Sequence, residues 1–518
     1  MPVHALSAAN LPDDVAALKR MLLGQAEAYE RELALLREQL NLALAKRFGR
    51  SSEKLLAPAQ LGLFNEAEAL CGESDAESDR TPETDIAVAA HQRQRGKRQP
   101  LPDYLPRERI EHDLPATEKT CPCGCTLTRI GEEISEQLDV IPAQVRVLQH
   151  VRIKYACKAC EETIKTAALP PQPLPKSNAS AGLLAHIAVA KYQDALPLAR
   201  QEQILQRAGV ELPRATTARW MIQLSEGIVP VIEQLRAQLL AYDVLQMDET
   251  RIQVLKEDGR APSSQSYMWV QRGGPPGRAV TLFHYDPSRG QDPASALLAG
   301  YRGYLQCDGY EVYGAIAAKS PAIRLIGCFA HARRKFDEAH KGQGKNHKPG
   351  KARQALDLIA RLYTIEKALK DLDPEARHTQ RQIKAKPILD ALHAWLQQAR
   401  PEVPPSTLTG KALTYLHNQW PRLIGYLEDG RLEIDNNSCE RAIRPFVIGR
   451  RNWLFADTPA GASASANLYS LIETAQANGH EPYRYLRHLF TKLPAASCAE
   501  DIDALLPTRL KPEDVPEP

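Results

Sequence analysis

The chain has 518 residues, too many for one hydrophobic core, so we expect three or four domains. Charged residues make up 25% and apolar residues 43% of it, and its 66 basic and 63 acidic residues leave a net charge of +3, which identifies no partner. No stretch approaches the roughly 18 apolar residues of a membrane span, and the start lacks the pattern of a signal peptide, so a cytoplasmic protein without membrane contact is expected.

A long helix is predicted for residues 13–48. Apolar residues recur there at alternating spacings of four and three, which is typical of a coiled-coil seam. The seam consists of Leu22, Ala26, Tyr29, Leu33, Leu36, Leu40 and Ala43. Because so narrow a stripe needs a partner helix, we expect a homo-oligomer. The alternative is a helix that folds back on its own protein.

Two charged segments follow this helix. Residues 73–85 ("ESDAESDRTPETD") are acidic and poor in apolar residues, which predicts a linker or a disordered segment. Residues 91–100 ("HQRQRGKRQP") are basic. Such a run is either a solvated tail or, beside a DNA-binding module, a contact to phosphates.

Five cysteines are clustered in the next block, residues 110–174. They are Cys121, Cys123 and Cys125 in "CPCGC", and Cys157 and Cys160 in "CKAC". Two cysteine turns joined by β-like sequence can place four thiolates around one tetrahedral, structural Zn²⁺. Four of the five suffice, and the spacing does not decide which one is spare. The alternative is a set of buried free thiols.

Three helices are predicted after the proline-rich segment "PPQPLPKS". The turn "AGV" at residues 208–210 separates the second from a third that begins near Pro213, which is the layout of a helix-turn-helix. We expect Trp220 on the packed side of the third helix. The residues expected on its exposed, DNA-facing side are Arg214, Thr216, Thr217 and Arg219. A three-helix unit without a DNA role is the alternative.

Strand patterns dominate from residue 242 onward. Their order is three strands, a helix, a strand, a helix and a strand, ending with "GYLQCDGY", "EVYGAIAA" and "IRLIGCF". An antiparallel meander followed by a crossover unit is expected, which is the order of a ribonuclease-H-like mixed α/β core. Helical sequence at 348–429 indicates an insertion into this core, and helices are predicted at "ANLYSLIETAQANG" and "YRYLRHLFTKL". The fold class is therefore multidomain α+β.

Three carboxylates stand out: Asp248 on the first strand, Asp308 at the end of the fourth, and Glu440 at the start of a later helix. The first and fourth strands are neighbours in this fold, and acids that approach each other repel unless a cation lies between them. Two Mg²⁺ or Mn²⁺ ions bound by such acids can serve an in-line phosphoryl displacement. Each acid taken alone also has a structural interpretation. Asp248 could be a solvated acid at a strand end, Asp308 could be a turn residue, and Glu440 could form a capping box with Asn437.

Several long motifs resemble the insertion-sequence-66 family of bacterial DDE transposases. They include "AVAKYQDALPLARQEQI", "MDET", "LQCDGY", "CFAHARRKF" and "GRLEIDNNSCERAIRPFVIGRRNWLFA". The resemblance covers nearly the whole chain. With the patterns above, it divides the chain into a coiled-coil helix (1–55), a flexible charged linker (56–108), a zinc-binding domain (109–174), a helix-turn-helix-like DNA-binding region (175–235), a ribonuclease-H-like core (236–345 and 431–480), a helical insertion domain (346–430) and a small C-terminal domain with a tail (481–518).

The resemblance implies that Asp248, Asp308 and Glu440 are the catalytic, magnesium-binding triad. It also implies a transposase that acts on double-stranded DNA in the nucleoid, namely transposon ends and target, with possible accessory proteins encoded by the same element. Cys328 and His331 in "CFAH" resemble a signature of related transposases, and no metal is assigned to them. The further candidate DNA contacts are Arg333, Arg334, Lys335, Arg441, Arg444, Arg450 and Arg451.

Two questions stay open at the level of sequence. Trp453 either stacks on an unpaired base or packs in the core. The chain is either a transposase or a sequence-specific DNA-binding regulator with an inactive core, against which the presence of all three acids argues. A ribonuclease or junction nuclease on the same fold is a weaker interpretation, because zinc and end-binding modules would then lack a purpose.

Overall fold

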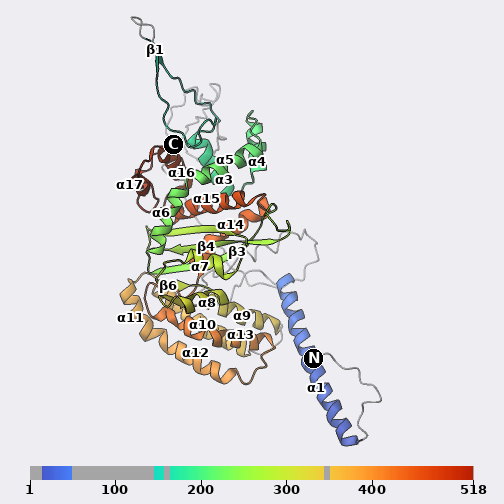
Figure 1. Cartoon of the computed structure of the whole chain (residues 1–518). Coiled ribbons are helices and arrows are strands. Elements are labelled where there is room, and N and C mark those ends of the chain that lie inside the picture. Colours follow the sequence, from blue (N-terminus) through green and yellow to red (C-terminus); the bar gives the residue numbers. More distant parts are fainter. Residues whose placement is uncertain (1–13, 49–144, 157–163, 344–349, 517–518) are drawn as a thin grey trace, which may run out of the picture. The chain divides into compact units, whose positions relative to one another are not determined.

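The computed structural model describes residues 14–48, 145–156, 164–343 and 350–516. Within them the chain is mixed α/β, with many helices, a five-stranded mixed sheet and a separate two-stranded sheet (Figure 1). None of the helices in these ranges is long and apolar enough to cross a membrane.

The N-terminal helix α1 (Val15–Phe48) is one long helix, as predicted. Asp14 caps its start, since its two carboxylate oxygens accept N–H bonds of 3.1 Å from the first turn. The predicted seam is exposed to solvent: Leu22, Leu33 and Leu40 keep 63%, 52% and 58% of their surface. The helix therefore has an apolar stripe that the described residues leave largely uncovered.

A short antiparallel hairpin, β1 (Lys154–Ala156) and β2 (Ile164–Thr166), follows. It belongs to the block in which the zinc site is predicted. The five cysteines lie outside the described residues: Cys121, Cys123, Cys125, Cys157 and Cys160. The zinc site accordingly stays a prediction.

Four helices precede the large sheet: α3 (Ala181–Tyr192), α4 (Leu198–Arg207), α5 (Arg214–Gly227) and α6 (Val229–Leu240). Ser180 caps α3, because its Oγ accepts the N–H of Leu183 at 3.1 Å. Gly209 lies in the turn between α4 and α5 with a φ of 79°, a conformation that glycine adopts without strain. The predicted layout of three helices with this turn is confirmed.

The sheet contains β3 (Val244–Gln253), β4 (Gln265–Gly273), β5 (Val280–Asp286), β6 (Gly303–Gln306) and β7 (Ile323–Ile326). The strand order is β5-β4-β3-β6-β7; β3, β4 and β5 are antiparallel, whereas β6 runs parallel to β3 and to β7. Helices α7 (Gln291–Leu297) and α8 (Glu311–Lys319) connect β5 to β6 and β6 to β7. The predicted meander and crossover are thus both present.

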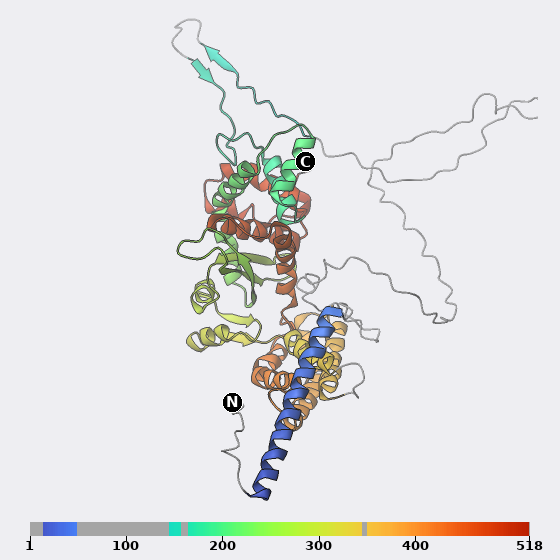
Figure 2. The same cartoon turned by 90° about the vertical axis from the view of Figure 1, so that its right-hand side faces the viewer.

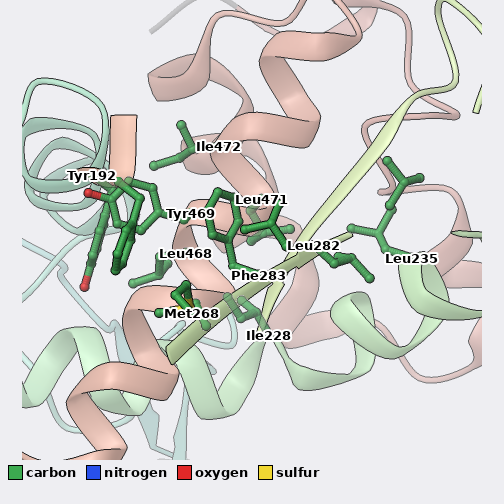
Figure 3. Close-up of a cluster of buried hydrophobic side chains, with 14 of the residues drawn as sticks. Tyr192, Ile228, Leu235, Met268, Leu282, Phe283, Leu468, Tyr469, Leu471 and Ile472 are labelled. Carbon is green, nitrogen blue, oxygen red and sulfur yellow. The ribbon is translucent and has the colours of Figure 1, made fainter. Parts of the chain in front are cut away.

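Helix α15 (Pro459–Ala477) covers the edge strand β5. Ser470 Oγ accepts the N–H of Phe283 at 2.7 Å, and Thr474 Oγ1 accepts the N–H of Thr281 at 3.1 Å. These bonds satisfy N–H groups that an edge strand would otherwise expose. Figure 3 shows the apolar side of this contact, where Phe283 lies among α15 side chains such as Tyr469.

The described residues form two hydrophobic cores: the first includes the large sheet, and the second lies mostly in the helical segment after β7. Its helices are α9 (Phe329–Gly342), α10 (Lys351–Ala368), α11 (Pro374–Lys384), α12 (Lys386–Ala399) and α13 (Leu408–Leu423), followed by a 3-10 turn at Ile424–Leu427. In Figure 2 these yellow and orange helices group together beside the blue α1. Near the end of α1, Asn41 donates to the carbonyl of Gly342 at 3.2 Å. Glu38 accepts the N–H of Leu408 at 3.2 Å.

The chain then returns to the sheet. Helix α14 (Asn437–Trp453) packs on β3 and β4, and α16 (Pro482–Lys492) packs on α3. A short helix, α17 (Ala499–Asp503), and the 3-10 turns Leu493–Ala495 and Pro512–Asp514 complete the described residues. The sheet, α3 to α6 and the C-terminal helices share the first core.

Candidate active site

Asp248 and Asp308 come from neighbouring parallel strands. In the register of β3 and β6, Gln246 pairs with Gln306. Each acid lies two residues beyond its member of that pair (248 − 246 and 308 − 306), so both lie toward the same edge of the sheet. Asp308 lies in the loop between β6 and α8, and its Oδ1 accepts the N–H of Tyr310 at 2.9 Å. The strand pairing therefore places both acids toward the same edge of the sheet.

Glu440 lies, buried, on the first turn of α14. The N-cap residue of this helix, Asn436, is held from two sides. Its Nδ2 donates to the carbonyl of Met247 on β3 at 3.2 Å, and its N–H donates to the Sγ of Cys328 at 3.2 Å. Because Met247 directly precedes Asp248, these bonds fix the start of α14 beside the strand that carries the first acid.

The alternative interpretation of Glu440 as half of a capping box is wrong. The N-cap is Asn436, one residue earlier than that interpretation requires, and its side chain makes no capping bond to the helix. The amide of Asn437 donates instead to Asp435 Oδ2 at 2.9 Å. Helix capping therefore does not explain the glutamate.

The acids of this region interact electrostatically. Burial raises the pKa of Asp248 well above its ordinary value, and the negative charges of Glu249, Glu440 and Asp308 raise it further. Buried carboxylates that repel one another need a compensating positive charge to remain ionised. An all-oxygen donor set of this charge fits a hard divalent cation such as Mg²⁺ or Mn²⁺.

Two side chains of α9 face the carboxylate of Glu440. The Nδ1 of His331 lies 3.8 Å from its Oε1, and the Nη2 of Arg334 lies 3.6 Å from its Oε2. Burial and the positive charge of Arg334 lower the pKa of His331 to about 4, so that its imidazole is neutral near pH 7. The sequence predicted no such contact, because 109 residues (440 − 331) separate the histidine from the glutamate.

Glu249 is a charged residue of the site that the sequence reasoning missed. Its Oε1 accepts a bond from the Nε of Arg289 at 2.8 Å, and its Oε2 accepts one from the hydroxyl of Tyr313 at 3.0 Å. Burial, followed by the charge of Asp308, raises its pKa, whereas Arg289 lowers it. The only signal in the sequence is its position directly after Asp248.

The predicted DNA contacts near the candidate site lie on α9 and on α14, the helix that carries Glu440. Lys335, Arg441 and Arg451 are exposed, and Arg333, Arg334, Arg444 and Arg450 are partly exposed. The guanidinium of Arg450 donates to Thr250 Oγ1 at 3.1 Å and to the carbonyl of Arg251. These bonds attach the end of α14 to β3, so Arg450 has a structural role whether or not it touches DNA.

On α5 the expected exposed face is wrong for Thr217. Arg214 and Arg219 are exposed and Thr216 is half-buried, but Thr217 is 2% exposed. Its hydroxyl donates to the carbonyl of Arg214 at 2.9 Å. Thr217 belongs to the buried stripe of the helix, at a helical spacing from Trp220, Met221 and Leu224. Its side chain is not available to DNA.

Trp453 packs against the core, which is the second of the two roles considered for it. Its ring lies edge-on to Phe446, with centroids 5.5 Å apart, and packs against the first core. The Nζ of Lys191 lies 5.7 Å from its centroid. The neighbouring Leu454 and Phe455 keep more exposure than the tryptophan.

Comparison with protein families gives four matches along the chain. A model described as the transposase IS66 family matches residues 176–464, more than half of the chain. The zinc-finger binding domain of transposase IS66 matches residues 118–161, and the IS66 C-terminal element matches 470–508. A leucine-zipper model described as transposase C of IS166 homeodomain matches 35–110.

Similar proteins occur in Sinorhizobium fredii. The chain is 32% identical to the uncharacterized protein y4qI over 553 residues, which cover 98% of this chain and 99% of that protein. It is 32% identical to the uncharacterized protein y4jD over 427 residues, which cover 80% of this chain and 82% of that protein.

Proposed function

Because this chain belongs to the IS66 family of transposases, we propose that it binds the terminal inverted repeats of an insertion sequence, cleaves the DNA there and transfers the freed strand into target DNA. The chain carries a DDE-type transposase domain. The strand order and connections of its sheet are consistent with a ribonuclease-H-like catalytic core. The helical segment at 346–430 would then be an insertion into that core.

The observation that carries the proposal is the placement of three acids from distant parts of the chain. Asp248 and Asp308 lie toward the same edge of two paired strands, and Asn436 bonds the start of the helix that carries Glu440 to β3. Asp308 and Glu440 both raise the pKa of Asp248. We assign these three residues as the catalytic acids. In the absence of a cation their repulsion is unfavourable, which supports a role in holding Mg²⁺ or Mn²⁺.

The proposed chemistry is two successive in-line displacements at phosphorus. Water first attacks the phosphodiester at the end of the element, the P–O3′ bond breaks, and the end retains a 3′-hydroxyl. That hydroxyl then attacks a target phosphodiester, forming a new P–O bond and releasing a target 3′-hydroxyl. A pair of divalent ions bound by the acids would activate the attacking oxygen and stabilise the leaving one.

The chain's own residues have defined parts in this proposal. Asp248, Asp308 and Glu440 would together hold the divalent ions through their carboxylate oxygens. Asn436 keeps Glu440 beside β3, and Arg334 is near enough to balance the glutamate's charge before an ion binds. No covalent enzyme intermediate is required.

DNA recognition is proposed for basic side chains in two regions. On α5, Arg214 and Arg219 are exposed on the third helix of the predicted helix-turn-helix. Near the acids, phosphates would meet the basic residues of α9 and α14, namely Arg333, Arg334, Lys335, Arg441, Arg444, Arg450 and Arg451. The first set would position the transposon end and the second the cleavage point.

Structural zinc and self-association complete the proposal. The zinc-finger match at 118–161 supports one Zn²⁺ bound by four of the five clustered cysteines. The leucine-zipper match at 35–110 and the exposed seam of α1 support a homo-oligomer. Accessory proteins from the same element and a location in the nucleoid are proposed from the family alone.

A cleavage assay on end-sequence DNA tests the catalytic assignment. Asp248→Asn, Asp308→Asn and Glu440→Gln should each reduce cleavage and strand transfer in Mg²⁺ by roughly 100-fold or more, while DNA binding persists. Asp258→Asn, which alters an exposed carboxylate on a turn after β3, is the matched control and should retain full activity. Full activity of any of the three site variants would refute the assignment.

The same assay separates the transposase from a DNA-binding regulator. Wild-type protein that binds the terminal repeats but cleaves nothing, with Mg²⁺ and with Mn²⁺, would favour the regulator. Footprinting on candidate inverted repeats identifies the DNA sequences to use in both the binding and the cleavage assay.

A further inference from the structure

A second group of metal-binding side chains shares Glu440 with the acid cluster. Ligand atoms of Cys328, His331 and Glu440 all lie within 4.8 Å of one another. Cys328 is the N-cap residue of α9, His331 is on the first turn of that helix, and Glu440 is on the first turn of α14. Two helix starts thus bring a thiol, an imidazole and a carboxylate to one place.

The sulfur of Cys328 is buried and held in position. It accepts the N–H of Asn436 at 3.2 Å, the same residue that fixes α14 to β3. The sulfur has further lone pairs beyond the one that accepts this N–H, and these remain able to bind a metal. The bond therefore does not compete with metal binding.

The imidazole of His331 has one nitrogen in position to bind an ion. Within the described residues, its Nδ1 is a buried atom without a hydrogen-bond partner. The 3.8 Å between Nδ1 and Glu440 Oε1 is too long for a hydrogen bond. Two atoms that each bind one ion at about 2.0–2.2 Å lie roughly 3–4 Å apart, so the observed spacing fits a shared ion.

We propose that Cys328, His331 and Glu440 form a transition-metal site, with Zn²⁺ as the ion that the ligand set fits best. Sulfur and nitrogen ligands select zinc over magnesium, whereas Asp248 and Asp308 offer only oxygen. Glu440 connects the two sites, because it is one of the three proposed catalytic acids and its Oε1 lies 3.8 Å from the Nδ1 of His331. The Arg334 side chain is 33% exposed and can turn toward solvent when an ion enters.

This arrangement has a consequence for activity, which rests on the proposed function. A Zn²⁺ ion bound at Cys328 and His331 engages the carboxylate that the Mg²⁺ site also needs. Zinc in micromolar excess should therefore inhibit Mg²⁺-dependent cleavage, and Cys328→Ser should relieve that inhibition. The binding site itself does not depend on transposition.

Zinc stoichiometry of the full-length protein tests the site directly. Protein is equilibrated with excess Zn²⁺, desalted and analysed by elemental mass spectrometry. His331→Asn, Glu440→Gln and Cys328→Ser should each hold one zinc per chain fewer than wild type, and any zinc of the predicted finger is present in all variants alike. Two matched controls should lose none: Cys439→Ser, whose sulfur faces the carbonyl of Val270 at 3.8 Å, and His340→Asn on the same helix α9.

Co²⁺ loading provides a second measurement on the same variants. Thiolate-to-cobalt absorption should fall in Cys328→Ser relative to wild type and Cys439→Ser. Thermal unfolding curves identify any variant that does not fold, and His331→Asn and Glu440→Gln test the site without altering the sulfur. Equal zinc content in wild type and the folded site variants would overturn the proposal, whatever the outcome of the cleavage assay.

Discussion

At the scale of single residues, buried polar side chains connect the segments that form the site. Gln246 on β3 donates to Gln306 on β6 and to the carboxylate of Glu433, both at 3.1 Å. Gln306 in turn donates to the carbonyl of Glu433 at 2.6 Å. The segment that leads into α14 is therefore bonded to the same two strands whose ends carry Asp248 and Asp308.

Glu473 on α15 is a buried acid that the proposed chemistry does not use, and it predicts a pH effect on stability. Burial raises its pKa to about 8, and Arg272 opposes this shift. Between pH 4.5, where the unfolded chain loses this proton, and about pH 8, the folded protein keeps it. Raising the pH through this window therefore lowers the free energy of unfolding.

Glu473→Gln should remove this dependence. The free energy of unfolding of the variant minus that of wild type should be about 1–4 kcal/mol larger at pH 8 than at pH 5. The reason is that the glutamine side chain never ionises. Melting temperatures of both proteins at the two pH values measure the difference. Glu233→Gln, at an exposed site on α6, should follow wild type, and parallel pH profiles for Glu473→Gln and wild type would contradict the burial argument.

At the scale of elements, the helical segment after β7 contacts the loop that holds Asp308. Gly309 follows this acid, and a Cβ placed there would lie 2.8 Å from the ring and 2.9 Å from the hydroxyl of Tyr415 on α13. The glycine thus permits close approach of α13 and does not adopt a positive φ. The inserted helices accordingly constrain the position of one proposed catalytic acid.

Gly309→Ala should therefore impair catalysis more than folding. Either the loop or Tyr415 must move, and a displaced Asp308 should lower the cleavage rate by roughly 10-fold or more. Gly227→Ala is the control, since a Cβ at this position in α5 meets no atom within 4 Å. Cleavage rates and melting temperatures are compared for both variants. Wild-type cleavage by a folded Gly309→Ala protein would disprove the constraint.

Local sequence patterns predicted the elements better than the contacts between them. The strand patterns of β3 and β4 and the crossover order were enough to predict that Asp248 and Asp308 lie toward the same edge of the sheet. The sequence predicted less well which face of a helix is buried. Thr217 was expected to be exposed, but it lies on the buried face of α5 together with Trp220 and Leu224. The grouping of Cys328 and His331 with Glu440 depends on how α9 and α14 meet, which no local pattern encodes.

At the scale of the whole molecule, α1 presents a stripe of leucines for which two partners are conceivable. Hydrogen bonds from Asn41 to Gly342 and from Leu408 to Glu38 join its C-terminal part to the rest of the chain, and neither involves the leucine stripe. They leave Leu33 and Leu40 more than half exposed. Covering a leucine of this kind contributes about 1.5–3 kcal/mol, so several per helix favour a second copy of α1 as the partner.

Leu33→Lys with Leu40→Lys should convert an oligomer into monomers, because each lysine would place a charge in the helix–helix seam. Molar mass measured by light scattering after size exclusion reports the change, without reference to DNA or metal. The control pair, Ala28→Lys with Ala34→Lys, adds the same charge at exposed positions outside the seam and should keep the wild-type mass. The proposal would be contradicted if the wild-type protein is a monomer. If, in addition, the leucine variant melts at a lower temperature than wild type and the control variant does not, α1 packs on its own chain through this stripe.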